Sequence, residues 1–171
     1  MNRALFLDRD GVINVEVNYL YKIEDFIFID GIFELCKKYQ NEGYFIFVVT
    51  NQSGIARSFY TQEDFDVLTS WMIEEFLKRG VTINKVYLCP HHPEISGECN
   101  CRKPKAGMIF EAKQEFDIDL ENSILVGDKE RDIEAAILAG IKESYLFDEK
   151  GVCKKSKATK IISRLEEIYK C

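Results

Sequence analysis

The apolar residues of this chain gather in five short runs, and the segments between the runs show helical spacing. The runs lack the polar alternation of a half-exposed sheet, which is typical of strands buried on both faces of a parallel sheet. Apolar periodicity with capping and glycine signals predicts the intervening helices and an amphipathic helix at the end of the chain. We expect strands over residues 5–8, 44–49, 85–88, 123–128 and 143–147, and helices over 32–39, 61–79, 104–116, 129–139 and 161–169.

Strands that alternate with helices predict the α/β class. We predict a doubly wound, mainly parallel five-stranded sheet in the order 3-2-1-4-5, with helices on both faces. The chain has 171 residues, the usual size of one domain, and no repeat or linker divides it. Residues 1–171 are therefore expected to form a single domain.

Composition narrows the classes of function. The net charge is −6, and there is no basic stripe with interleaved aromatic residues, so nucleic acid is not an expected partner. No apolar run approaches the ~20 residues that span a bilayer, and no signal-peptide pattern opens the chain. We therefore expect a cytoplasmic monomer without a membrane partner. An anionic substrate would need a metal ion or local positive charge against this overall field.

Acidic residues stand where two of the predicted strands end. Asp8 and Asp10 follow the first strand, and two residues apart in an extended chain they point the same way. Two carboxylates about 5 Å apart repel by roughly 3 kcal/mol at an effective dielectric near 20, and a divalent cation offsets this best. Asp128 ends the fourth strand at the same edge of the sheet. The pattern favours Mg²⁺, although each acid alone also fits a solvated turn or a helix cap, with Asp132 complementing the helix dipole.

Three further residues could meet an oxyanion. Thr50 ends the second strand and offers a hydroxyl, while Arg102 and Lys103 offer a bidentate fork and a point charge. Considered alone, Thr50 equally fits strand-end capping, and the basic pair equally fits a solvated loop. With the acids nearby, the three residues favour a phosphate-bearing substrate.

A second cluster of chemistry lies between the third strand and the next helix. Cys89, His91, Cys99 and Cys101 supply three thiolates and one imidazole. This is a complete tetrahedral ligand set for Zn²⁺ with no open position, so the site is expected to be structural rather than catalytic. The alternative is free cysteines or an oxidised pair. Bound zinc would order the loop that leads to the basic pair.

Taken together, these residues resemble the haloacid dehalogenase-type phosphohydrolase superfamily. That family has Asp-x-Asp after the first strand, Ser or Thr after the second, a later Lys, and an acidic motif after the fourth. The resemblance runs from residue 4 to about 147. The segments that carry it are FLDRDGVIN (6–14), VTNQSGIAR (49–57), CPHHP (89–93), CNCRKP (99–104) and VGDK (126–129).

The resemblance implies a role for each matching residue. Asp8 would be the nucleophile that forms an aspartyl-phosphate, and Asp10 the acid and then base, which calls for a buried, like-charged setting. Thr50 and Lys103 would steady the phosphoryl group. The residues implied around Mg²⁺ are Asp8, Asp10 through its backbone carbonyl, Asp128 and Lys129. The residues implied in substrate binding are Glu16, Val17, Asn18, Tyr19, Asn51, Gln52, Ser53 and Arg102.

Within the superfamily, the chain most resembles the small phosphatases that remove the 7-phosphate from a heptose bisphosphate during surface-polysaccharide precursor synthesis. Histidinol-phosphate phosphatases are near relatives and provide the alternative function. The intervals 10–50 and 50–103 leave no room for the large cap domain found elsewhere in the superfamily, so only loops are expected to shape specificity.

Overall fold

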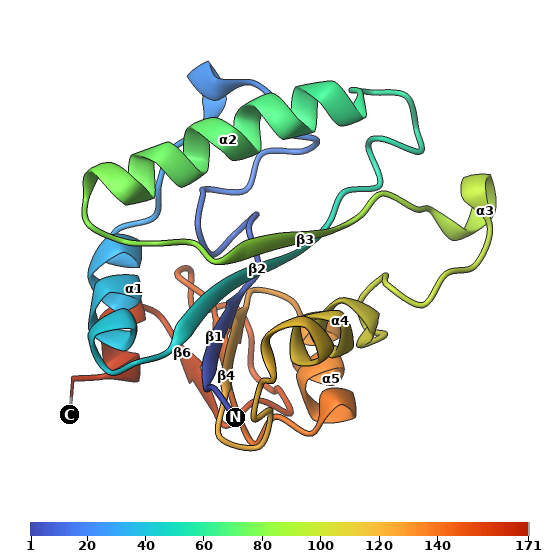
Figure 1. The fold of residues 1–171 in the computed structure, drawn as a ribbon. Helices are drawn as coiled ribbons and strands as arrows, with labels where there is room; N and C mark the ends of the chain where they lie inside the picture. The colour runs from blue at the N-terminus through green and yellow to red at the C-terminus, as the bar shows by residue number, and fades with distance from the viewer. Residues whose placement is uncertain (171) are drawn as a thin grey trace.

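The computed structural model describes residues 1–170, which contain one six-stranded sheet with helices on both faces (Figure 1). All strand pairs are parallel, and the order is β3-β2-β1-β4-β5-β6. The α/β class and the order of the first five strands are therefore confirmed. The strands are β1 (Ala4–Leu7), β2 (Phe45–Asn51), β3 (Lys85–Cys89), β4 (Ile124–Gly127), β5 (Glu143–Phe147) and β6 (Lys160–Ile162).

Helices and 3₁₀ turns connect the strands. Every predicted strand agrees with an observed one to within two residues. The elements are η1 (Ile23–Asp25), α1 (Ile32–Asn41), α2 (Gln62–Lys78), α3 (Pro93–Ser96), α4 (Gly107–Phe116), α5 (Glu130–Ala139) and η2 (Leu165–Ile168). None of the helices in residues 1–170 is both long and apolar enough to cross a membrane.

Alternate residues of each strand feed two separate hydrophobic cores. In β1, Leu5 and Leu7 belong to the core that includes α1 and α2, whereas Ala4 and Phe6 belong to the core that includes α4 and α5. Figure 1 shows these two pairs of helices on opposite faces of the sheet. Because both faces are covered, the strands read as continuous apolar runs.

The strand register brings three carboxyl ends together. Leu7 pairs with Val48 of β2 and with Val126 of β4, and the Asp8 N–H donates to the Val126 carbonyl at 3.0 Å. Thr50 is the penultimate residue of β2. The chain order reverses at β1, since β2 lies on one side of it and β4 on the other. Ligands of open α/β sheets bind at this kind of reversal.

The predicted terminal helix over 161–169 is wrong. Lys160–Ile162 forms the edge strand β6, which pairs with Tyr145–Phe147, and only the 3₁₀ turn η2 follows. The apolar spacing of Ile161, Leu165 and Ile168 mimics a helix, but Ile162 and Leu165 are the residues buried against the core. Edge pairing with β5 therefore overrides the local periodicity, and the sheet has six strands rather than five.

The third predicted helix, which is α4, begins later than expected, at Gly107 rather than at Pro104. The residues before it form a turn in which the Lys105 N–H donates to the Arg102 carbonyl at 2.9 Å. The Gly107 N–H donates to the Asn100 carbonyl at 3.1 Å, so the loop closes directly onto α4. This turn aims Lys103 at the sheet instead of leaving it on a helix surface.

Candidate active site

A cavity of about 200 Å³ opens at the carboxyl ends of β1, β2 and β4. Its wall includes Asp8, Asp10 and Asp128, so the structure brings together the three acids that the sequence singled out. The other lining residues are Glu16, Val17, Asn18, Tyr19, Asn51, Gln52, Ser53, Gly54, Tyr60 and Arg131. All the predicted substrate-binding residues except Arg102 are among them.

Lys103 joins Asp8 of the cavity wall to a second, buried acid. Its Nζ lies 2.8 Å from Asp8 Oδ1 and 2.7 Å from Asp132 Oδ1, and all three side chains are at most 7% exposed. Asn51 fixes the lysine, because its side chain accepts from the Lys103 N–H at 3.0 Å and donates to the Lys103 carbonyl at 3.1 Å. The result is a buried ion-pair triad whose central cation faces the predicted nucleophile.

Burial and neighbouring charges both shift the pKa values of these groups. Burial, with Asp132 and Asp128 nearby, raises the pKa of Asp8 well above its usual value, although Lys103 opposes this. Burial and Asp132 likewise raise the pKa of Asp128. Burial lowers the pKa of Lys103, but the two carboxylates outweigh burial and raise it overall. The lysine is therefore held as a cation, while the acids lack enough positive charge to offset their burial.

Two glycines let the acids approach so closely. A Cβ on Gly11, whose φ is +87°, would lie 2.3 Å from Asp128 Oδ2, and a Cβ on Gly127 would lie 2.2 Å from the Cβ of Asp132. Carboxylate oxygens of Asp8, Asp128 and Asp132 lie within 4.8 Å of one another. Asp128 Oδ1 is buried and has no hydrogen-bond partner among residues 1–170. A buried, unpartnered oxygen inside a group of carboxylates fits a hard divalent cation.

The surroundings of Asp10 differ from the expected like-charged setting. The chain bends at Arg9, so Asp10 does not extend directly from the strand. Arg9 Nη2 lies 2.9 Å from Asp10 Oδ1, Asn14 Nδ2 donates to the same oxygen at 3.0 Å, and Gln52 Nε2 donates to Oδ2 at 2.9 Å. Donors, rather than acids, therefore fix the Asp10 carboxylate at the cavity wall.

Gln52 links this carboxylate to the second strand. Its Nε2 also donates to Thr50 Oγ1 at 2.8 Å, and its Oε1 accepts from the Tyr60 hydroxyl. Thr50 is fully buried, so its hydroxyl lies just behind the cavity rather than on its wall. The network connects the first and second predicted motifs through side chains.

The rim of the cavity is made by two loops that pack on each other. Tyr19, in a left-handed conformation at φ 57°, makes an edge contact with Phe59, their ring centroids 4.5 Å apart. Glu16 lies on the same loop, and its Oε2 forms an ion pair with Lys129 Nζ at 3.1 Å. Lys129 Nζ also lies 3.2 Å from Asp128 Oδ2. The Lys129 side chain therefore balances acidic charge at the rim, and a protonated amine cannot itself bind a metal ion.

Arg102 lies away from this rim. Its Nη1 donates to the His91 carbonyl at 3.2 Å, which ties it to the cysteine-rich loop. It is not among the residues that line the cavity.

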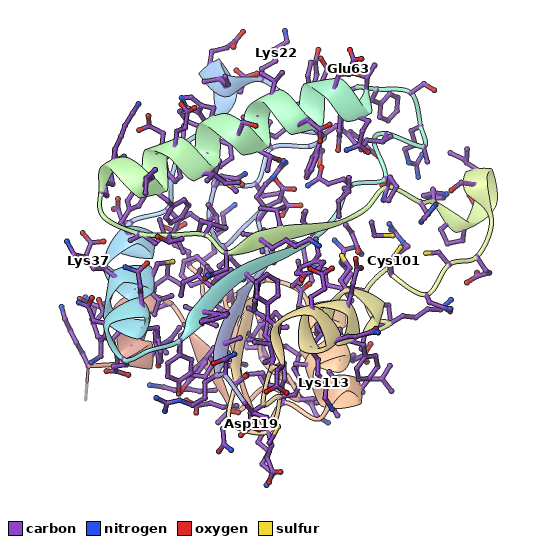
Figure 2. All side chains as sticks on the ribbon, viewed as in Figure 1. Lys22, Lys37, Glu63, Cys101, Lys113 and Asp119 are labelled. Carbon is purple, nitrogen blue, oxygen red and sulfur yellow. The ribbon has the colours of Figure 1, made fainter. Side chains whose placement is uncertain are left out.

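The cysteine-rich loop contains the predicted four-residue cluster. Ligand atoms of Cys89, His91, Cys99 and Cys101 lie within 4.8 Å of one another, and the cysteines are free thiols. His91 Nδ1 lies 3.2 Å from Cys101 Sγ, and Cys89 Sγ lies 2.9 Å from Cys101 Sγ. Figure 2 shows the sulfur atoms near Cys101, in the loop beyond the end of β3. Such a convergence of soft donors could hold one metal ion.

Sequence reasoning missed four residues of the site. Asp132 was assigned to the helix dipole, and its Oδ2 does accept the Lys129 N–H at 3.0 Å, but its other oxygen pairs with Lys103. Arg9, Tyr60 and Arg131 were not singled out. Buried charges must be paired, so an acid close to the end of the fourth strand was a candidate partner for a buried cation, and this is the signal that could have pointed to Asp132. Cys36 is buried in the core and Cys153 is half-buried, while Cys171 lies outside the described residues.

Comparisons with known proteins agree with this geometry. A family model described as HAD-hydrolase-like matches residues 100–167. A Campylobacter jejuni protein named D-glycero-alpha-D-manno-heptose-1,7-bisphosphate 7-phosphatase is 52% identical over 147 residues, covering 86% of this chain and 83% of that protein. A Haemophilus influenzae protein named as the corresponding beta-heptose phosphatase is 44% identical over 150 residues, covering 85% and 82%.

A solved structure is similar across nearly the whole chain. It is a D,D-heptose 1,7-bisphosphate phosphatase from B. bronchiseptica in complex with magnesium and phosphate, with a TM-score of 0.83 and 26% identity. The alignment covers 97% of this chain and 95% of that one.

Proposed function

Because this chain belongs to the HAD-like family of heptose-1,7-bisphosphate 7-phosphatases, we propose that it removes the 7-phosphate of such a sugar through an aspartyl-phosphate on Asp8. The observation that carries the proposal is the buried Asp8 carboxylate, which lies at the cavity wall 2.8 Å from the Lys103 ammonium. A carboxylate nucleophile next to a fixed cation is suited to attack on a phosphate that bears negative charge.

The hydrogen bonds of Asp8 indicate which of its oxygens attacks. Both the Arg9 N–H, at 2.9 Å, and Lys103 Nζ, at 2.8 Å, donate to Oδ1. Oδ2 therefore forms the bond to phosphorus while the bond from phosphorus to the sugar oxygen breaks. Asp10, which lines the same cavity, gives a proton to the leaving oxygen and later takes one from the water that hydrolyses the phosphoenzyme.

The acids fit Mg²⁺, and we propose that Asp8, Asp128 and the Asp10 carbonyl would hold it. Lys129 would act on this ion site through its charge and not as a ligand, because its ammonium lies 3.2 Å from Asp128. When bound, the ion would neutralise part of the negative charge on the phosphoryl group. Asp132 is left to Lys103, whose ammonium lies 2.7 Å from it.

We further propose that Cys89, His91, Cys99 and Cys101 bind a structural Zn²⁺. The four donors complete a tetrahedral set, and no further described His, Cys, Asp or Glu belongs to the cluster. The loop they form also contacts Arg102, through the His91 carbonyl, and Asn100 holds the start of α4. The metal would therefore act on catalysis by fixing the segment that carries Lys103.

Replacing Cys99 by Ser is expected to weaken zinc retention by about tenfold or more and to raise KM. The reason is that a hydroxyl is a poor ligand for this borderline-soft ion, and even outer partners of a metal ligand contribute about 10–100-fold to affinity. Metal content after dialysis and steady-state kinetics check this. The matched control is Cys153→Ser, outside the cluster. Wild-type zinc content and KM in the Cys99 variant would contradict the zinc site.

The function itself is tested by comparing kcat/KM for heptose 1,7-bisphosphate with kcat/KM for histidinol phosphate. We expect the sugar bisphosphate to be the better substrate, since both alpha- and beta-heptose phosphatases are relatives at 44–52% identity.

Chelation of Mg²⁺ should lower kcat by at least about a hundredfold, with recovery on adding Mg²⁺ back, because charge neutralisation at the transition state is lost. Faster turnover of histidinol phosphate would overturn the proposal, and so would full activity in chelator.

A further inference from the structure

We propose that Arg131 binds the second phosphate of the substrate, the one that is not removed. The inference rests on the proposed function, and it assigns to this residue the distinction between a sugar bisphosphate and a sugar monophosphate. It follows from where Arg131 lies and from which positive charges of the site are already paired.

Arg131 belongs to the first turn of α5, three residues beyond Asp128. It is exposed, and it lines the same cavity as Asp8 and Asp10. It is the only lysine or arginine among the described lining residues. The Arg131 guanidinium therefore lines the same cavity as Asp8, the predicted nucleophile. It is carried by helix α5, whereas the predicted substrate-binding residues lie before that helix in the chain.

Three other cations that contact acids of the cavity wall are already paired. Lys103 lies between Asp8 and Asp132. Lys129 lies between Asp128 and Glu16, and Arg9 is paired with Asp10. Arg131 makes no ion pair with any carboxylate in residues 1–170, so its charge remains available for a ligand.

The wall of the cavity is rich in acids, which favours a free cation for a second phosphate. Asp8, Asp10, Glu16 and Asp128 all line it, and such a wall repels a substrate that carries two phosphates. Lys103 and a bound metal can act on the phosphate at Asp8, but neither is free to act on a second one. The planar fork of an arginine matches phosphate oxygens in a bidentate manner, which makes Arg131 suited to this second group.

The test compares Arg131→Gln, Arg131→Lys and wild type on heptose 1,7-bisphosphate and heptose 7-phosphate. We expect Arg131→Gln to lower the ratio of kcat/KM for the bisphosphate to kcat/KM for the monophosphate by about 10–100-fold, since a charge-assisted contact to phosphate is lost. Most of the change should be in KM, because the second phosphate does not react. Arg131→Lys should recover part of the ratio, because lysine keeps the positive charge but lacks the two-pronged geometry of the guanidinium.

The control is Lys113→Gln, an exposed cation on α4 that is labelled in Figure 2 and lies outside the cavity lining. This variant should keep the wild-type ratio. A ratio that stays at the wild-type value in Arg131→Gln overturns the inference, and so does an equal loss on both substrates, which would assign Arg131 to the transferred phosphate. Thermal melting of each variant accompanies the kinetics, so that an equal loss caused by a folding defect, which lowers Tm, is told apart from an equal loss caused by a missing contact to the transferred phosphate.

Failure of the proposed function gives a different result. It would be seen in the wild-type enzyme, as a preference for histidinol phosphate over heptose bisphosphate. If the wild-type enzyme prefers the bisphosphate but the ratio is unchanged in Arg131→Gln, only the role of Arg131 is wrong. A wild-type enzyme that treats the two sugars alike also overturns the inference, because the second phosphate then contributes nothing.

Discussion

Replacing Asp8 by Asn is expected to abolish phosphoenzyme formation and to lower kcat by about 10⁴-fold or more. An amide is nearly the same size as the carboxylate, so Lys103 and the cavity should remain in place while the proposed nucleophile is lost. Loss of a covalent nucleophile removes the whole two-step route, because the other described carboxylate that pairs with Lys103, Asp132, is buried and does not line the cavity.

Acid quench of the enzyme with substrate, followed by mass spectrometry of the intact chain, detects the phosphoenzyme directly. The matched control is Asp66→Asn, an exposed aspartate on α2 that lies outside the cavity lining. Activity within a hundredfold of wild type in the Asp8 variant, or a phosphoenzyme that still forms, would rule out Asp8 as the nucleophile.

The second large effect is expected for Lys103→Gln, which should lower the free energy of unfolding by about 3–5 kcal/mol. The variant leaves the carboxylates of Asp8 and Asp132 buried beside each other, and glutamine cannot neutralise them. The Lys103 side chain is 2% exposed, so water cannot replace the lost partner. Activity should fall by about 10²–10³-fold, the usual loss for one donor to a developing charge. Urea unfolding and steady-state kinetics measure the two effects.

The control is Lys38→Gln, which breaks an ion pair with Glu42 in which both side chains are more than a third exposed. Exposed pairs contribute at most about 1 kcal/mol, so this variant should remain near wild type. Adding Asp132→Asn to Lys103→Gln should recover part of the stability but little activity, since it removes the stranded carboxylate without restoring the cation. Equal stability of the two lysine variants would contradict the buried triad.

The sequence was informative about the fold wherever burial follows from composition. Five strands could be predicted because a strand covered on both faces must be apolar at every position, as in Leu5–Leu7 and Ile46–Val49. The strand β6 could not, because it has only three residues, of which one is fully buried, and so carries too short an apolar pattern. The strand forms by pairing with β5, in a register that places Lys160 opposite Tyr145, fifteen residues earlier in the chain. Local apolar periodicity cannot predict a contact over that distance.

For the site, the sequence alone determined which chemical groups the chain offers: the acids at 8, 10 and 128 and Thr50 near strand ends, Lys103 in a loop, and the three thiols and one imidazole between Cys89 and Cys101. Residue type and position at a strand end are enough to group the acids and Thr50, because the carboxyl ends of parallel strands lie at the same edge of the sheet. Only the tertiary structure decided the partners. It paired Asp132 with Lys103, surrounded Asp10 with donors, turned Arg102 toward His91 and brought Arg131 into the cavity. The reason is physical: side-chain pairing depends on distances between segments that are far apart in the chain, whereas burial and strand ends leave a local pattern.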